Sequence, residues 1–357
     1  MYTKPLSYIT LPSALKDAYE EISKLSSGLD EVSYAEFERE LGKNIAQLSQ
    51  RLQSGLYSPE PLKKIEIDKP NSDEKRPIAL SAIKDKIVQR VLYKNLNPYF
   101  DKLFSDKSYA YRPDKSTIKA INRTTDFLNK KRLHIVKTDI DDFFETIDHD
   151  ILLEILDTHI SDKSITRLIS LFVQVGGFQN FDYSSHLQGI HQGDILSPLL
   201  SNIYLDVMDR FLEKHDIAFV RYADDFVMLF KSKNEAYGTL KELRKFLKTI
   251  KLTLNKEKTS VTHISDGFDF LGIEFKGRNR HIQNERLQRS VSKIAQLSKT
   301  KLGFAAFTKE LNSYLLSLKN YYLKILTPNA PQHKLLQDAL IATLSHKVYL
   351  SKKSKEI

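Results

Sequence analysis

Apolar residues recur at helical spacing over much of the chain. Residues 11–27 and 34–54 are predicted to form two helices, the second with an apolar stripe that Gly55 is expected to end. The stripe consists of Phe37, Leu41, Ile45, Leu48 and Leu52. The same spacing predicts helices over residues 82–100, 116–131, 164–175 and 235–250, one that begins near Asp148, and one that runs from Pro198 to about Leu212.

Shorter apolar segments between these helices predict strands. Residues 63–80 (KKIEIDKPNSDEKRPIAL) form a predicted hairpin with Pro-Asn-Ser-Asp at its tip. Ile135, Val136 and Ile140 make a short strand that ends among acidic residues. Residues 217–230 (IAFVRYADDFVMLF) contain two apolar runs around adjacent acids, which predicts a hairpin with the acids at or near its tip. The chain therefore mixes helices and sheets, as α+β proteins do.

Beyond residue 276 the pattern is helical again. Apolar positions follow each other at spacings of three and four, which is typical of a buried helix face rather than a platform for stacking bases. These positions are Phe304, Phe307, Leu311, Tyr314, Leu315, Leu318, Tyr321, Tyr322 and Ile325.

Composition narrows the class of protein. A chain of 357 residues can bury a substantial core and ordinarily divides into two or three lobes. The absence of cysteine excludes disulfides and cysteine metal sites and fits a reducing compartment. The N-terminus lacks an apolar signal core, and no apolar run approaches the roughly 20 residues that span a membrane. We therefore expect a cytoplasmic protein without a membrane partner.

Positive charge is concentrated at one end of the chain. The net charge is +10, and residues 276–357 hold 16 Lys and Arg against 4 Asp and Glu, a net of +12. A Lys-rich solvated surface is the simpler reading. A basic segment joined to a weakly acidic remainder favours contact with a polyanion such as nucleic acid.

Three aspartates are the candidate catalytic residues. Asp224 and Asp225 are adjacent at the hairpin of residues 217–230. Asp139 lies at the end of the predicted strand that contains Ile135 and Val136. An isolated acidic turn is the alternative for the first two. Carboxylates held together repel each other unless a cation neutralises them. Oxygen ligands suit Mg²⁺ or Mn²⁺, and three carboxylates can hold two such ions about 4 Å apart for attack on a phosphate.

Five blocks occur in order along the chain, and together they carry a resemblance. They are KRPIALSAIKDKIVQRVLYKNLNPYFDKLFSDKSYAYRP (75–113), KTDIDDFFETIDHDIL (137–152), QGDILSPLLSNIYLDVMDRFL (192–212), RYADDFVMLF (221–230) and LTLNKEKTSVTHISDGFDFLGIEF (252–275). The chain resembles prokaryotic reverse transcriptases of the group II intron-like type, which have retron, CRISPR-associated and defence-associated relatives. SYLLSLKNYYLKI (313–325) is similar to the thumb of that family.

The resemblance implies a right-hand polymerase with fingers, an antiparallel-sheet palm and a helical thumb. It implies an N-terminal helical extension over residues 1–58, interleaved fingers and palm over 59–275, and a basic helical thumb and tail over 276–357. Asp139, Asp224 and Asp225 would bind two Mg²⁺, which Mn²⁺ can replace, with the backbone of Ile140 beside them. The expected reaction is RNA-directed DNA synthesis by two-metal nucleotidyl transfer.

The resemblance also assigns substrate contacts. The expected nucleotide-binding residues are Lys75, Arg76, Phe144, Gln192, Gly193, Lys256 and Lys258, and one of the two last lysines would protonate pyrophosphate. The expected nucleic-acid contacts are Arg112, Tyr222, Leu271, Gly272, Arg278, Arg280, Arg286 and Arg289.

Three of these positions carry further expectations. Arg112 lies in SYAYRP, which departs from the family's SYGFRP at Ala110 and Tyr111. It either contacts the template or nucleotide or only supports the palm. Gly193 would allow its backbone to approach the substrate. Phe270-Leu271-Gly272 would begin a strand near the primer end.

Phe144 bears on the choice between DNA and RNA products. It follows Asp139 by five residues, the spacing of the sugar-selecting aromatic residue in reverse transcriptases, and a ring there would collide with a ribose 2′-hydroxyl. A core position is the alternative for Phe144 and the expectation for Phe143.

Three classes of function remain open at this level. The first is a reverse transcriptase that uses an RNA template, a primer and deoxynucleoside triphosphates, in a standalone defence enzyme with a dedicated non-coding RNA, a CRISPR-associated enzyme or a compact intron protein. The second is an RNA-directed RNA polymerase or a template-independent polymerase. The third is a non-catalytic RNA-binding scaffold, which the intact acidic residues argue against. The setting in antiphage defence is favoured, and the oligomeric state is not indicated.

Overall fold

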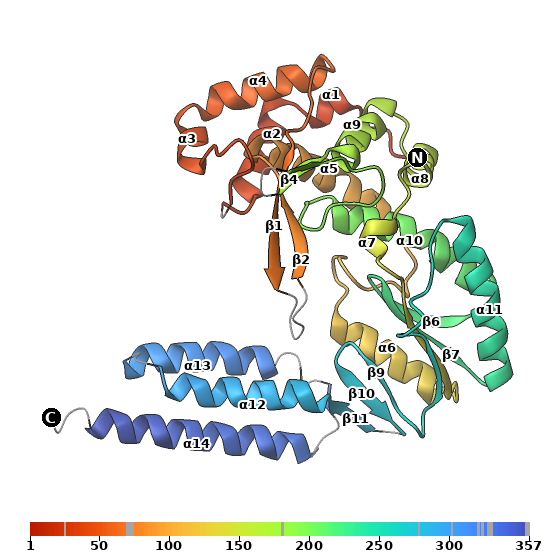
Figure 1. Cartoon of the computed structure of the whole chain (residues 1–357), viewed down its shortest axis with the longest axis vertical. Helices are drawn as coiled ribbons and strands as arrows, with labels where there is room; N and C mark the ends of the chain where they lie inside the picture. The colour runs from red at the N-terminus through yellow and green to blue at the C-terminus, as the bar shows by residue number, and fades with distance from the viewer. Residues whose placement is uncertain are drawn as a thin grey trace. The chain divides into compact units, whose positions relative to one another are not determined.

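The computed structural model describes residues 1–24, 26–68, 75–179, 182–277, 279–300, 303–319, 322, 325–326 and 331–353. The chain forms two compact units, each built from three separated segments (Figure 1). The first unit consists of Met1–Asp114, Asp139–Asp216 and Lys241–Lys256. The second unit consists of Lys115–Thr138, Ile217–Leu240 and Glu257–Ile357. The lobe boundaries expected at residues 58 and 275 stay a prediction.

The first unit begins with four helices, which are α1 (Leu6–Ile9), α2 (Pro12–Glu21), α3 (Tyr34–Arg39) and α4 (Leu41–Gln53). The single helix predicted over residues 34–54 is wrong, because Glu40 interrupts it and separates α3 from α4. The first predicted helix also ends early, at Glu21, since Ile22 is extended and buried. Gly55 ends α4 as expected and takes a positive φ of +72°.

A four-stranded sheet follows in the same unit. It contains β1 (Leu62–Asp68), β2 (Lys75–Leu80), β4 (Gly177–Gln179) and β5 (Asp182–Ser184) in the order β2-β1-β4-β5. β1 and β2 pair antiparallel, which confirms the first predicted hairpin, whereas its expected Pro-Asn-Ser-Asp tip lies outside the described residues. β4 instead pairs parallel to β1.

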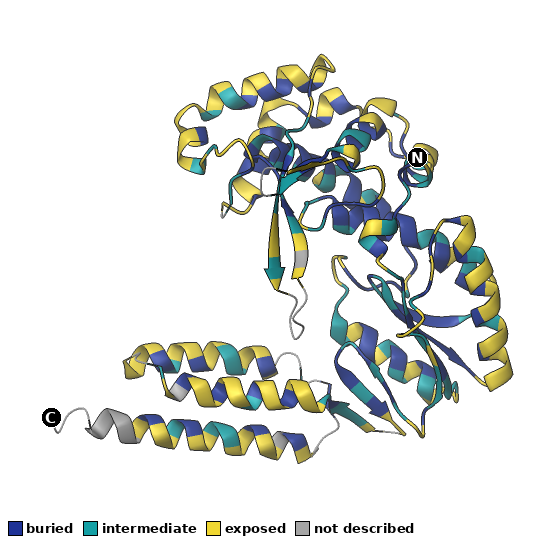
Figure 2. Ribbon diagram, viewed as in Figure 1, coloured by how far each residue is buried: buried dark blue, intermediate teal, exposed yellow. Residues whose placement is uncertain are grey.

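The remaining helices of the first unit supply a large part of its core. They are α5 (Ile83–Phe100), α7 (Phe143–Thr146), α8 (His149–His159), α9 (Lys163–Gln174) and α10 (Ser197–Lys214). α5, α8, α9 and α10 confirm predicted helices, and Asp148 caps α8 by accepting a hydrogen bond from the Ile151 amide at 3.1 Å. α10 is apolar on several sides and buries eleven of its residues, so it is a central element of the unit (Figure 2).

A second four-stranded sheet forms the centre of the second unit, and of its residues only Asp139 is assigned to the first unit. It contains β3 (His134–Asp139), β6 (Ala218–Tyr222), β7 (Asp225–Phe230) and β8 (Ser260–His263) in the order β6-β7-β3-β8. α6 (Thr117–Asn129) packs against β6 and β7. α11 (Lys233–Thr249) follows β7 and confirms the helix predicted over residues 235–250. The mixture of helices with antiparallel sheets confirms the α+β class.

A smaller antiparallel sheet lies next along the chain. Its strands are β9 (Phe268–Phe270), β10 (Ile273–Lys276) and β11 (Asn279–Ile282), with β10 in the middle. The expectation that Phe270-Leu271-Gly272 begins a strand is wrong. Phe270 ends β9, and Leu271 and Gly272 form the turn to β10 with positive φ angles of +52° and +80°.

Among the residues that the structure describes, the second unit ends with the helices α12 (Asn284–Ser298), α13 (Phe304–Leu318) and α14 (Pro331–Lys353). The apolar stripe predicted here is mainly core: Phe307, Leu311, Leu318 and Ile325 are buried, and Tyr314, Leu315 and Tyr322 are partly buried. Phe304 is 49% exposed, and Tyr321 lies outside the described residues. Within the part of the chain that the structure describes, no helix is long and apolar enough to cross a membrane.

Candidate active site

The paired acids lie at the tip of the β6–β7 hairpin, as the sequence predicts. Tyr222 pairs with Asp225 across the two strands, so Ala223 and Asp224 form the turn. The flanking strands are almost wholly buried, which fixes the register and brings the acids to the end of the sheet. Ala223 adopts a left-handed φ of +58°, and the buried Arg221 donates a hydrogen bond to its carbonyl oxygen at 3.0 Å.

The strand order places β3 beside this hairpin. β3 is the neighbour of β7 in the sheet, and Arg132, just before β3, donates to the carbonyl oxygen of Leu229, near the end of β7, at 3.5 Å. The two strands therefore run antiparallel, and the end of β3 lies at the same end of the sheet as the start of β7. Asp139 is the last residue of β3.

The donor set suits a hard divalent cation, because each of the three aspartates is partly exposed and offers carboxylate oxygens. Among the residues that the structure describes, however, no three His, Cys, Asp or Glu side chains converge as they do around a bound metal ion. The chemistry of the side chains therefore fits the expected metal, while their assignment as ligands stays a prediction.

The segment after Asp139 separates the two phenylalanines. Asp142 takes a left-handed φ of +39° and begins the short helix α7. Phe143 is buried at 2% exposure, as expected for a core residue, and Phe144 is partly exposed. Their rings meet edge to face at 5.7 Å between centroids. Phe144 thus has the exposure that a sugar-selecting residue needs, and this role stays a prediction.

Gln192 and Gly193 lie against the β1–β2 hairpin of the first unit. The carbonyl oxygen of Gln192 accepts a hydrogen bond from the Ala79 amide of β2 at 2.8 Å. Gly193 has a φ of +109°, and a Cβ there would lie 2.8 Å from the Ala79 carbonyl oxygen and 2.9 Å from Ile78 Cγ2. Close contact with β2 is therefore a structural reason for the glycine, and its expected contact with a substrate stays a prediction.

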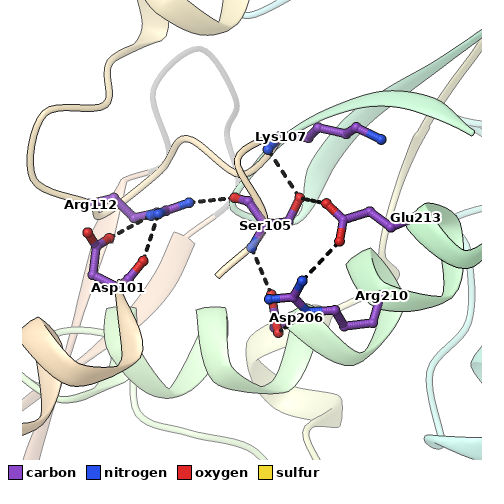
Figure 3. Close-up of polar contacts among 7 residues, drawn as sticks. All are labelled: Asp101, Ser105, Lys107, Arg112, Asp206, Arg210 and Glu213. Atoms are coloured by element: carbon purple, nitrogen blue, oxygen red, sulfur yellow. Dashed lines mark hydrogen bonds and ion pairs between the residues drawn. The ribbon is translucent and has the colours of Figure 1, made fainter. Parts of the chain in front are cut away.

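Arg112 is held inside the first unit (Figure 3). Its side chain is 4% exposed and pairs with Asp101, with 2.6 Å between Nε and Oδ1. Its guanidinium also donates to the carbonyl oxygens of Asp101, Ser105 and Ser108 at 2.9, 2.6 and 3.0 Å. Ser105 continues the network to α10, through Asp206 and Glu213. Of the two roles that the sequence leaves open, these contacts match support of the fold.

The other predicted nucleotide contacts are exposed or only partly described. Lys75 is exposed and lies 3.5 Å from Glu66 across the hairpin, and the side chain of Arg76 lies outside the described residues. Lys256 and Lys258 are exposed in the turn before β8. These positions are open to solvent, so the structure leaves their roles as predictions.

The predicted nucleic-acid contacts of the second unit are spread over several elements. Tyr222 and Leu271 are partly exposed, and a Cβ on Gly272 would lie 2.3 Å from the guanidinium of the exposed Arg286. Arg280 donates to the Asn122 side chain at 3.1 Å, and burial lowers its pKa. Arg289 pairs with Glu285 at 3.4 Å, and Arg278 lies outside the described residues.

Two further features belong to the first unit. Asp194 accepts a hydrogen bond from the Ser81 hydroxyl at 2.5 Å, and burial raises the pKa of its carboxyl to about 6. His186 stacks on His191 with 3.8 Å between ring centroids, and burial lowers their pKa values to about 4 and about 3. Single histidines with no metal-ligand spacing give no signal in a sequence, because only the fold brings them together.

Comparison with known proteins defines the class. The family model described as "Reverse transcriptase (RNA-dependent DNA polymerase)" matches residues 67–275, which is more than half of the chain. The chain therefore belongs to the reverse transcriptase family, and its enzyme class is that of an RNA-directed DNA polymerase. A model of viral RNA-dependent RNA polymerases also matches residues 198–353.

Individual relatives narrow the likeness to one branch. The chain is 29% identical over 284 residues to Protein YkfC of Escherichia coli, covering 69% of this chain and 74% of the relative. It is 28% identical over 301 residues to the group II intron-encoded protein LtrA of Lactococcus lactis, and the match covers 66% of this chain and 50% of LtrA. It is 25% identical over 289 residues to the putative COX1/OXI3 intron 2 protein of Saccharomyces cerevisiae, and the match covers 64% of this chain and 34% of that protein. The chain thus spans half or less of the two intron-encoded relatives, and the resemblance to group II intron-like enzymes is confirmed.

Proposed function

We propose that this protein extends a primer with deoxynucleotides along an RNA template, with Asp139, Asp224 and Asp225 as its catalytic acids. The observation that carries the proposal is the β6–β7 hairpin, whose tip presents Asp224 and Asp225 at the end of a buried sheet. These carboxylates would hold Mg²⁺ or Mn²⁺, whose positive charge would favour attack by a 3′-hydroxyl and departure of pyrophosphate.

The chain's own residues have separate tasks in this proposal. The carboxylates of the three aspartates hold the cations. Phe144 lies beneath the sugar and excludes a 2′-hydroxyl. Lys75 and Arg76 close on the triphosphate, and Lys256 or Lys258 donates a proton to pyrophosphate. The basic residues beyond 276 hold the template–product duplex through its phosphates, independently of sequence.

Primer extension on an RNA template with a DNA primer tests the proposal. Asp224→Asn and Asp225→Asn should each abolish incorporation in Mg²⁺ and in Mn²⁺ while the protein stays folded. Asp17→Asn, which removes an exposed acid from α2, is the matched control and should retain full activity. Extension by Asp225→Asn at the wild-type rate would overturn the assignment of the site.

The biological setting is a further part of the proposal. The names of two relatives are those of intron proteins, one of them encoded by a group II intron, and they favour a protein that acts with an intron RNA. An enzyme of antiphage defence that copies a dedicated non-coding RNA in the cytoplasm is the second candidate, and the lack of cysteine is compatible with that compartment. Sequencing the RNA that copurifies with the protein, together with its DNA product, separates the two, since an intron sequence supports the first alone.

A further inference from the structure

The segment that follows α11 is joined to the chain around Asp139. The Asn255 amide donates to the Asp139 carbonyl oxygen at 2.9 Å, and the Asp141 amide donates to the Thr253 carbonyl oxygen at 2.9 Å. Between these bonds, Ile140 and Leu254 form an antiparallel bridge and are buried at 2% and 7% exposure. All six residues belong to the first unit, so the pairing lies within one compact body.

Asn255 adds a side-chain bond to this backbone pairing. Its Nδ2 donates to Asp141 Oδ1 at 2.9 Å, across 114 positions of sequence. One residue therefore holds both the main chain of Asp139 and the carboxylate of Asp141. Both side chains are partly buried, where a hydrogen bond to a charged group is stronger than in open water.

The effect of this contact on the site depends on the side chain of residue 255 being an amide. Successive side chains of an extended chain alternate, so residues two apart share a side, and Asp141 stands two residues after Asp139. A carboxylate on the side of the catalytic acid repels a triphosphate and competes for its cation. A lysine at position 255 would cancel that charge, whereas the amide of Asn255 keeps the charge and fixes its position.

We propose that Asn255 is a positioning residue for nucleotidyl transfer, which restrains the Asp141 carboxylate and thereby sets the affinity of the site for the deoxynucleoside triphosphate and its divalent cation. This inference rests on the proposed function, because it takes Asp139 as a catalytic acid. Asn255→Ala keeps the backbone amide and its bond to Asp139 and removes only the side-chain restraint. The expected effect is a rise of about tenfold in the KM for dNTP, with a smaller change in kcat.

A double-mutant cycle with an exchanged pair is the decisive experiment. The variants are Asn255→Ala, Asp141→Ala, the double alanine variant, and the exchange Asn255→Asp/Asp141→Asn, which retains one amide donor, one carboxylate and the net charge. The exchange should restore KM to within about threefold of wild type, and the double alanine variant should be no worse than Asp141→Ala. An exchange variant as impaired as Asn255→Ala would overturn the proposal.

Stability and metal binding separate this role from a structural one. Asn44→Ala is the matched control, because Asn44 Nδ2 donates to the Phe37 carbonyl oxygen at 3.0 Å in a partly buried position away from the acids. It should lower the thermal midpoint as much as Asn255→Ala does and leave KM unchanged. An equal rise in KM in Asn255→Ala and Asn44→Ala would contradict the proposal, because it would show that Asn255 acts only through the stability of the fold.

Mn²⁺ binding, followed by electron paramagnetic resonance without nucleotide or primer, needs no turnover. Asn255→Ala should change the Mn²⁺ affinity at least threefold, and Asn44→Ala should not. If wild type makes no DNA but this Mn²⁺ difference is present, the proposed function fails, and with it the role in nucleotidyl transfer, while the effect of Asn255 on cation binding stands. If DNA is made and neither Mn²⁺ affinity nor KM responds to Asn255→Ala, the positioning role fails alone.

Discussion

Replacing Arg112 by alanine should destabilise the protein without acting on the template directly. The side chain is 4% exposed and its partner Asp101 is 25% exposed, so truncation leaves a carboxylate and three main-chain carbonyl oxygens without their donor. Breaking a buried ion pair from one side costs about 3–5 kcal/mol, and the fork of Arg112 supplies more than the pair alone. Arg112→Lys keeps the charge but cannot reach all these acceptors, so about 1–3 kcal/mol should still be lost.

Thermal unfolding followed by circular dichroism measures this effect. A loss of about 3–5 kcal/mol corresponds to a fall of roughly 5–15 °C in the midpoint. Arg210→Ala is the matched control in the same network, because Arg210 pairs with Asp206 and Glu213 at 3.1 and 3.0 Å but is 51% exposed (Figure 3). An exposed pair contributes less than about 1 kcal/mol, so this variant should unfold close to wild type.

Template binding measured on the same variants distinguishes the two roles of Arg112. At a temperature where Arg112→Ala is folded, its affinity for a primer–template duplex and the slope of that affinity against salt should equal those of wild type. A midpoint at the wild-type value, together with a salt slope reduced by about one, would show that Arg112 contacts a phosphate and would refute the reasoning from its burial.

Four further outcomes are expected. Phe144→Val should keep dNTP incorporation and gain rNTP incorporation by about a hundredfold or more, measured by primer extension with each pool supplied separately; loss of both activities would make Phe144 a core residue. Duplex binding should weaken steeply between 50 and 200 mM salt, because residues 276–357 carry a net charge of +12, and a flat titration would contradict a grip on phosphates. Gly193→Ala should lower the free energy of unfolding, measured by chemical denaturation, by a few kcal/mol, since its Cβ would lie 2.8 Å from the Ala79 carbonyl oxygen at a φ of +109°. Gly42→Ala, in open space on α4, should not lower it. As the pH drops from about 6.5 towards 4, the unfolded state binds protons that His186 and His191, with pKa values lowered to about 4 and about 3, do not bind when folded, so these two residues lower the free energy of unfolding, whereas the raised pKa of Asp194 acts in the opposite direction; denaturation at several pH values should therefore show a smaller fall towards low pH, or a larger rise, in His186→Gln/His191→Gln than in wild type.

The sequence predicted best those elements whose local spacing of apolar residues is sufficient to determine them. The β6–β7 hairpin has two apolar runs of strand length with polar residues between them, and α5 and α10 have long apolar stripes, so local periodicity was sufficient. The predicted helix over residues 34–54 failed at Glu40, because the capping box at Ser33 and Glu36 starts one helix and the periodicity alone carries no sign of a second start.

The site was predictable where a residue type has one strong chemical use and not where a contact depends on distant segments. Adjacent aspartates at a hairpin tip suggest a cation from the sequence alone. The burial of Arg112 depends on three carbonyl oxygens between residues 101 and 108, and the bond from Asn255 to Asp141 joins positions 114 residues apart. Such contacts follow from the path of the backbone, which a motif does not specify.

The division of each compact unit into three stretches of chain affects how the protein is made. On a ribosome, Met1–Asp114 emerges well before the Lys241–Lys256 stretch that belongs to the same unit, and the chain that begins the other unit emerges between them. Neither unit can therefore fold to completion as a consecutive domain, and the nascent chain holds unfinished apolar surfaces for many seconds at about 5–20 residues per second. Chaperone dependence during synthesis is the expected consequence of this interleaving, since the long-range pairings come late.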